Sequence, residues 1–272
     1  MGKFDGMLFC TDLDGTLYNS DTQVSQENLD AIAYFKAEGG LFTFITGRVP
    51  MTSSEACRII QPNAPYGCIN GGGIYDPVKD AYLWHATLPA AAIELMEYID
   101  ERLPEIGIQV NTEKDVYFSK DNVAMEWFRQ VTGMPPLMRD YHDIPEPMLK
   151  VLFAHHEDDM IDEVARLLAE HPASKHYDFI RSEKVLYELL PKGISKGGAL
   201  TKMAQLLGID MHNTVAVGDY ENDVSMIRAA GIGYAVANAR PAAKAVADRI
   251  TVSNDEHAIA AIVAELERER SC

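Results

Sequence analysis

"FCTDLDGTLYNS" (residues 9–20) decides the fold class of this 272-residue chain. Its apolar lead-in, "MLFC" (residues 7–10), is typical of a buried strand, and two carboxylates, Asp12 and Asp14, follow it. Side chains two apart on an extended chain point the same way, so at ~4 Å and a dielectric of about 20 these charges repel by about 4 kcal/mol. An offsetting cation or a bound proton is needed there, and either one indicates a chemically active site.

Short apolar runs alternate with helical patterns in the first and last thirds of the chain. Three further runs of this kind are "LFTFIT" (41–46), "YGCIN" (66–70) and "TVAVGD" (214–219). Helical patterns begin near Ser25, Ser195 and Glu221, and Ser25 has the chemistry of a helix N-cap. The alternation predicts an α/β fold in which a mostly parallel sheet is covered by helices on both faces.

The middle of the chain has a different order of elements. From about Leu88 to about Leu190 the pattern predicts a helix, two strands, a helix, a strand, a helix and two strands. Adjacent strands without a helix between them favour an antiparallel or mixed sheet. We therefore expect a core of residues 1–86 and 190–272, with an inserted α+β domain of residues 87–189.

Composition narrows the range of partners. The chain has 41 Asp and Glu against 24 Lys and Arg, for a formal net charge of −17. Such an acidic chain disfavours nucleic acid and anionic membranes, because both attract basic faces. No signal segment or membrane span is visible, so we expect a cytoplasmic protein that is a monomer or a weak homodimer. Free thiols are expected at the four cysteines, Cys10, Cys57, Cys68 and Cys272.

Polar residues follow every predicted core strand at the edge where an open parallel sheet binds ligands. They are Thr11, Asp12, Asp14 and Thr16; Thr46, Gly47 and Arg48; Asn70 and Gly71; and Gly218, Asp219, Asn222 and Asp223. Several carboxylates at one spot require a hard divalent cation, and oxygen-only ligands suit Mg²⁺. Once it held that cation, the site would be positive enough to bind a phosphate.

Phosphoryl chemistry is open to such a site. Thr46 and the N–H of Gly47 could hold phosphate oxygens, and Lys196, at the start of a predicted helix, would add a positive charge. An ionised Asp12 could attack phosphorus. Asp14 could carry a proton to the leaving oxygen and then take one from water.

Four motifs in chain order resemble those of one known family. They are "DLDGT" (12–16), "TGR" (46–48), "KGISK" (192–196) and "GDYEND" (218–223). Together they resemble the haloacid dehalogenase superfamily, which has a Rossmann-like core. The large insertion between the second and third motifs, with "NGGGIYD" (70–76), resembles the Cof-type phosphatase subfamily with its type II cap.

The resemblance implies a role for each matching residue. Asp12 would be the nucleophile, forming an aspartyl-phosphate, and Asp14 the general acid/base. The implied phosphate-binding residues are Thr46, Gly47, Lys196 and Asn222. The implied Mg²⁺ ligands are Asp12, Asp14 (through its backbone carbonyl), Asp219 and Asp223. The substrate would be a small phosphorylated metabolite, foremost a sugar phosphate.

Two alternative functions stay open. A phosphosugar mutase would use the same motifs and return the phosphoryl group to sugar. A non-catalytic regulatory protein would keep the phosphate and Mg²⁺ sites without turnover. The presence of the full set argues against it: Asp12, Asp14, Thr46, Lys196, Asp219 and Asp223.

Other side chains have competing interpretations. Arg48 could grip substrate or pair with an acidic residue. "HHEDD" (155–159) favours a helix cap at Asp158 or Asp159 over a metal cluster. Trp127 is expected to pack inside the inserted domain in preference to stacking on a substrate.

Overall fold

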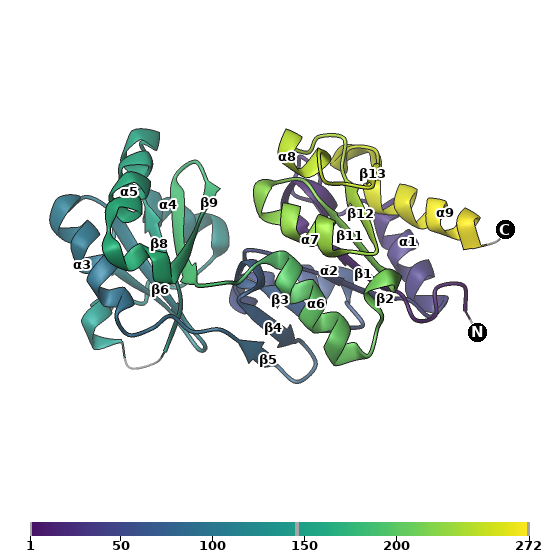
Figure 1. The fold of residues 1–272 in the computed structure, drawn as a ribbon, viewed down its shortest axis with the longest axis horizontal. Helices are drawn as coiled ribbons and strands as arrows, with labels where there is room; N and C mark the ends of the chain where they lie inside the picture. Colours follow the sequence, from purple (N-terminus) through teal and green to yellow (C-terminus); the bar gives the residue numbers. More distant parts are fainter. Residues whose placement is uncertain (1, 145–146, 271–272) are drawn as a thin grey trace. The chain divides into compact units, whose positions relative to one another are not determined.

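The computed structural model describes residues 2–144 and 147–270. The chain forms two compact units (Figure 1): the first ends at Trp84 and resumes at Ser195, and the second spans His85–Ile194. The first unit is therefore assembled from two separate stretches of chain, whereas the second is contiguous in sequence.

A five-stranded parallel sheet forms the core of the first unit, in the order β13-β12-β11-β1-β2. Its strands are β1 (Leu8–Thr11), β2 (Leu41–Phe44), β11 (Thr214–Gly218), β12 (Ile232–Ala235) and β13 (Arg249–Ile250). Leu8 of β1 pairs with Thr214 on one side and Leu41 on the other. All of β1 is buried because it has a strand on each side and helices on both faces. The predicted α/β fold with a mostly parallel sheet is confirmed.

Alternate side chains of β1 face helices on opposite sides of the sheet. Leu8 and Cys10 belong to an apolar cluster with α6 (Lys196–Leu207) and α7 (Val224–Ala229). Phe9 points the other way and packs edge-on against Phe35 of α1 (Gln26–Ala37), with 5.7 Å between ring centroids. Because both faces of the strand are covered, Leu8, Phe9 and Cys10 are all apolar and do not alternate with polar residues.

Among the described residues, three more α-helices belong to the first unit. They are α2 (Pro50–Ile60), α8 (Pro241–Lys244) and α9 (Ala258–Arg270), and α9 packs beside α1 (Figure 1). Ser25 caps α1 by accepting a hydrogen bond from the Asn28 N–H, as predicted, and Ser195 caps α6 in the same way through Gly198. The Ser195 cap fixes where α6 begins and thereby places Lys196 in its first turn.

The "YGCIN" run forms a strand, but its predicted place in the core sheet is wrong. This strand, β3 (Tyr66–Cys68), belongs to a separate sheet of order β3-β4-β5, with β4 (Gly73–Asp76) and β5 (Ala81–His85). An isolated parallel bridge between Ile45 and Gly67 links β3 to the end of β2. The chain reverses immediately after Cys68 and pairs β3 with β4 in antiparallel fashion, so β3 joins a hairpin instead of extending the parallel sheet.

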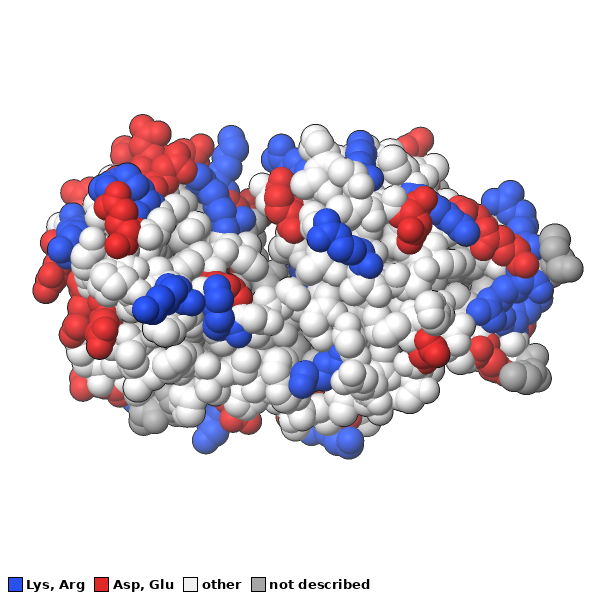
Figure 2. All heavy atoms as spheres, viewed as in Figure 1, with Lys and Arg blue, Asp and Glu red and all other residues white. Residues whose placement is uncertain are grey.

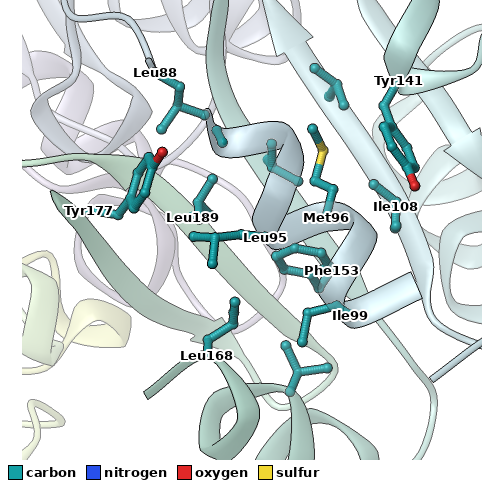
Figure 3. Close-up of a cluster of buried hydrophobic side chains, with 14 of the residues drawn as sticks. Leu88, Leu95, Met96, Ile99, Ile108, Tyr141, Phe153, Leu168, Tyr177 and Leu189 are labelled. Carbon is teal, nitrogen blue, oxygen red and sulfur yellow. The ribbon is translucent and has the colours of Figure 1, made fainter. Parts of the chain in front are cut away.

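The second unit is built on an antiparallel sheet of order β7-β6-β8-β10-β9. Its strands are β6 (Gly107–Thr112), β7 (Val116–Lys120), β8 (Met148–Ala154), β9 (Tyr177–Glu183) and β10 (Leu186–Pro191), and its α-helices are α3 (Ala92–Arg102), α4 (Val123–Thr132) and α5 (Asp158–Glu170). Figure 3 shows the core, where Leu95 and Ile99 of α3 and Leu168 of α5 pack with Phe153 and Leu189 of the sheet. The order of elements is the predicted one.

Two predictions for the second unit are wrong. Trp127 on α4 is 47% exposed and does not pack in the interior. The N-cap of α5 is Glu157, so Asp158 and Asp159 lie in the first turn of the helix. Carboxylates in the first turn interact favourably with the positive end of the helix dipole without accepting a capping hydrogen bond. Acidic residues at the start of a helix are therefore expected in either case.

The surface charges and the cysteines do not indicate a functional site. On the face shown in Figure 2, Lys and Arg side chains lie scattered among Asp and Glu. No helix in the described part of the chain combines the length and apolar character needed to cross a membrane. Cys10 and Cys57 are free thiols, Cys68 is buried, and Cys272 lies outside the described residues.

Candidate active site

Asp12 lies directly beyond the carboxyl end of β1, a strand flanked by β11 and β2 in the parallel sheet. Its backbone N–H donates to the carbonyl oxygen of Val217 at 2.9 Å, which continues the β1–β11 ladder by one residue. The residue is only 6% exposed. The position of the Asp12 carboxylate is therefore set by the sheet itself.

Lys196 brings a buried positive charge to this carboxylate. Its Nζ lies 2.6 Å from Asp12 Oδ1 and 2.6 Å from Asp223 Oδ1, and the residue is 1% exposed. An ammonium group has three N–H donors. Among the described residues two of the three are accepted, which leaves one for an incoming anion.

Asp223 and Asp219 come from the loop after β11. Asp223 Oδ2 accepts hydrogen bonds from the backbone N–H groups of Asp219 and Tyr220, both at 3.0 Å. The Asp219 carboxylate accepts from the Thr16 hydroxyl at 3.2 Å. Burial, with a further contribution from the Asp223 charge, raises the pKa of Asp219 to about 6. The Thr16 hydroxyl thus helps to hold the Asp219 carboxylate in place.

The carboxylates of Asp12, Asp219 and Asp223 form a cluster that carries excess negative charge. One oxygen from each lies within 4.8 Å of the others. Burial, reinforced by Asp223, raises the pKa of Asp12, whereas Lys196 acts in the opposite direction. Three carboxylates and one ammonium leave an excess of two negative charges when all are ionised. A hard dication with oxygen ligands fits this donor set in both charge and chemistry.

Asp14 points to a different partner. Its side chain is 55% exposed and accepts two hydrogen bonds from Arg48, from Nε at 3.0 Å and from Nη2 at 2.5 Å. The Arg48 guanidinium also lies over the Tyr18 ring, 5.4 Å from its centroid. Of the two interpretations of Arg48, the structure shows pairing with an acidic residue, and that residue is Asp14.

A tight turn, Leu13–Leu17, begins directly after Asp12 and contains Asp14. Strand β1 ends at Thr11, so the chain does not continue as an extended strand through Asp14, and Gly15 in this turn has a φ of 76°. A Cβ on Gly15 would lie 2.6 Å from Asp219 Oδ2, so glycine is required both for the turn and for the close approach of Asp219. Asn238, which the prediction missed, donates to the Gly15 carbonyl at 2.8 Å. Its signal was a polar residue soon after a strand, in "VANA" (236–239).

Thr46 and Gly47 follow β2 at the same edge of the sheet. Thr46 is 1% exposed, and its backbone N–H donates to the Gly67 carbonyl at 3.0 Å. Its hydroxyl oxygen accepts from the Arg48 N–H at 3.2 Å. The hydroxyl proton of Thr46 therefore has no acceptor among the described residues and can donate to a bound oxygen.

Asn70 joins this loop to the last predicted site residue, Asn222. The Asn222 amide donates to Asn70 Oδ1 at 2.9 Å, and the Asn70 N–H donates to the Thr46 carbonyl at 3.0 Å. In the sequence, Asn70 stands out only as a polar residue after a strand, and it was not among the predicted site residues. The structure thus brings most of the predicted residues together in two groups, one around Lys196 and one around Asn70. The Asp14 carboxylate belongs to neither group and is hydrogen-bonded to Arg48.

Comparison with known proteins supports one family. The model of the haloacid dehalogenase-like hydrolase family matches residues 9–263. The chain is 30% identical over 273 residues to the Bacillus subtilis protein YxeH, covering 95% of this chain and 97% of that protein. It is 30% identical over 279 residues to the Bacillus subtilis 5-amino-6-(5-phospho-D-ribitylamino)uracil phosphatase YwtE, covering 94% and 96%. The crystal structure of a haloacid dehalogenase-like hydrolase from Bacteroides thetaiotaomicron superposes with a TM-score of 0.84 at 25% identity, covering 96% and 99%.

Proposed function

Because this chain belongs to the haloacid dehalogenase-like hydrolases and is a phosphatase of that family, we propose that it removes phosphate from a small phosphomonoester with Mg²⁺ as cofactor, through an aspartyl-phosphate on Asp12. One observation carries the proposal: the buried Lys196 ammonium joins Asp12 to Asp223. A buried cation that orients a carboxylate at a ligand-binding edge suits a nucleophile, and a bound dication would offset the remaining negative charge so that a phosphate could approach.

Three carboxylates would hold the metal. Asp12, Asp219 and Asp223 supply oxygen ligands, and the backbone carbonyl of Asp14 would add another. When bound, Mg²⁺ would neutralise charge on the phosphoryl group and so permit its approach to a carboxylate.

Asp12 would act as the nucleophile. Lys196 orients the Asp12 carboxylate by donating a hydrogen bond to Oδ1. Because Asp12 is buried, few water molecules would compete with it for phosphorus in the first step. An Asp12 oxygen would form a bond to phosphorus in line with the breaking bond to the leaving oxygen. The product of this step would be the aspartyl-phosphate and a free alcohol.

Asp14 would move the protons. In the first step it would give a proton to the leaving oxygen, and in the second it would take one from the water that attacks phosphorus. That attack would release inorganic phosphate and regenerate Asp12. Arg48, which holds the Asp14 carboxylate in two places, would keep it in position between the steps.

The phosphoryl oxygens would be held by donors from the loop after β2, the loop after β11 and the first turn of α6. These donors are the hydroxyl of Thr46, the backbone N–H of Gly47, the third N–H of Lys196 and the amide of Asn222. Charge-assisted bonds of this kind are shorter and stronger than neutral ones, so Lys196 would contribute most to phosphate affinity.

The substrate is proposed to be a sugar phosphate or a sugar-alcohol phosphate. The relative YwtE is named for a substrate with a phosphorylated ribityl chain, which is a compound of this class. The inserted residues 87–189 would form the cap that selects the leaving group.

A direct assay tests the proposal. Purified protein with Mg²⁺ should release phosphate from p-nitrophenyl phosphate and from members of a sugar phosphate panel, and EDTA should abolish the release. No Mg²⁺-dependent release from any substrate would overturn the proposal and favour a regulatory binding protein. Transfer of phosphate to sugar that depends on an added bisphosphate would instead identify a phosphosugar mutase.

A further inference from the structure

The segment after β3 has a strained backbone. Ile69 and Asn70 have φ values of 54° and 53°, and Gly71 follows with 95°. Positive φ is unusual for residues other than glycine and is an outlier for a β-branched residue such as Ile69. Such strain persists only where neighbouring structure holds it, and it concentrates at functional sites.

Backbone hydrogen bonds hold this segment against the phosphate-binding loop. The Ile69 N–H donates to the Arg48 carbonyl at 3.0 Å, and the Asn70 N–H donates to the Thr46 carbonyl at 3.0 Å. On its other side, the backbone of Gly71 contacts the start of α6, because a Cβ there would lie 2.0 Å from the Ser195 carbonyl oxygen. The strained segment therefore lies between the loop of Thr46 and the helix that presents Lys196.

The side chain of Asn70 adds a contact to a third loop. It is buried, and its Oδ1 accepts from the Asn222 amide at 2.9 Å. It also lies against Gly47, where an added Cβ would be 3.0 Å from Asn70 Oδ1 and 3.1 Å from Nδ2. Asn222 Oδ1 is itself buried and has no hydrogen-bond partner among the described residues, so the amide of Asn222 is oriented through Asn70.

We propose that Asn70 is a positioning residue of the phosphoryl pocket: it fixes Asn222 relative to the Thr46–Gly47 loop so that donors from both reach one phosphoryl group. This inference rests on the proposed function. Asn suits the position because it tolerates positive φ better than other non-glycine residues and carries a side-chain acceptor for Asn222. Neither the four motifs nor their spacing identified it.

A purely structural role for Asn70, in turning the chain from β3 to β4, is the competing explanation. The Asn70→Gly variant separates the two, because glycine accepts the positive φ while the amide is lost. Binding of inorganic phosphate in the presence of Mg²⁺ is measured by calorimetry, alongside p-nitrophenyl phosphate kinetics and the Tm. We expect a Tm close to that of the wild type and about tenfold weaker phosphate binding.

Gln61 offers a matched control. It also has positive φ, 48°, but it lies exposed at the end of α2, away from the site. The Gln61→Gly variant should bind phosphate and turn over substrate as the wild type does. Should Asn70→Gly fail to fold, Asn70→Asp keeps the acceptor for Asn222 and places a negative charge beside the phosphate, so its phosphate affinity should fall further still.

A double-variant cycle tests the route through Asn222. If Asn70 acts by orienting Asn222, adding Asn70→Gly to Asn222→Ala should cause little further loss of phosphate affinity. Fully additive losses would overturn the inference, as would wild-type phosphate binding by Asn70→Gly in an active enzyme. A wild-type protein that neither binds phosphate nor hydrolyses any phosphomonoester would instead refute the proposed function, and this inference with it.

Discussion

Lys196 and Asp223 form an ion pair that water does not reach. Their Nζ and Oδ1 atoms are 2.6 Å apart, and the two side chains are 1% and 0% exposed. Because the other Asp223 oxygen accepts two backbone N–H groups, the pair fastens the start of α6 to the loop after β11. One charge therefore serves both the stability of the fold and the geometry of the site.

Removal of Lys196 should destabilise the protein. The Lys196→Met variant leaves the Asp12 and Asp223 carboxylates buried without a cation, and loss of one partner from such a pair costs about 3–5 kcal/mol in the free energy of unfolding. Urea denaturation measures this loss. Adding Asp223→Asn should recover part of it, and the exposed Lys175→Met should change neither stability nor activity. A Lys196→Met protein as stable as the wild type would show that the Lys196 ammonium does not stabilise the fold.

Replacement of Asp12 by Asn should abolish turnover without unfolding the protein. The amide cannot attack phosphorus, whereas the loss of one carboxylate relieves repulsion within a buried acidic cluster. The Tm of Asp12→Asn in EDTA should therefore equal or exceed that of the wild type, while phosphate release falls to background. Turnover at the wild-type rate would eliminate Asp12 as the nucleophile.

Loss of Asp219 should weaken metal binding. The Asp219→Ala variant keeps the Lys196 ion pairs but lacks one of three clustered carboxylates. The Mg²⁺ concentration for half-maximal activity should rise at least about tenfold, and the rise in Tm on adding Mg²⁺ should largely disappear. The exposed Asp21→Ala is the control, and an unchanged Mg²⁺ titration for Asp219→Ala would refute the ligand role.

The stabilising effect of Mg²⁺ should depend on pH. Burial raises the pKa of Asp219 from 3.8 to about 6. Between these two pH values, the metal-free native state therefore binds more protons than the unfolded chain. This group therefore makes the metal-free protein less stable as pH rises from about 4 to 6. Mg²⁺ displaces those protons, so its Tm increment should be small at about pH 5 and near its maximum at about pH 7.5. Equal increments at both values would contradict this linkage.

Disruption of the Asp14–Arg48 pair should affect poor leaving groups most. An alkoxide needs a proton from Asp14 as it departs, whereas p-nitrophenolate leaves readily without one. Arg48→Ala should thus lower kcat for a sugar phosphate by about tenfold or more and change p-nitrophenyl phosphate turnover much less. Arg48→Lys should restore part of the lost rate. Equal losses for both substrates would indicate instead that Arg48 binds the phosphoryl group.

Local pattern and strand periodicity were sufficient to predict much of the structure. The apolar runs that precede Asp12, Thr46 and Asp219 are short strands of one parallel sheet, so their polar ends necessarily meet at one edge. The order of helices and strands in the second unit followed in the same way from pattern alone.

Features set by tertiary contacts could not be predicted. The sheet that β3 joins depends on the reversal at Ile69–Asn70, which has no clear local signal. The direction of the Asp14 side chain depends on Arg48, and the role of Asn70 depends on Asn222, which lies 152 residues away in sequence. The exposure of Trp127 could not be predicted for the same reason. An amphipathic pattern does not reveal how much of the helix surface is covered by the rest of the domain.

The discontinuous first unit has a consequence for synthesis on the ribosome. Strand β1 emerges early, yet its neighbour β11 is translated only after the whole of His85–Ile194. The nascent chain must therefore carry an unfinished apolar sheet edge while the contiguous unit is already able to fold, since domains generally fold as they emerge. Premature termination before β11 would leave the edge of β1 that pairs with β11 without a partner, and an unpaired apolar edge of this kind favours aggregation.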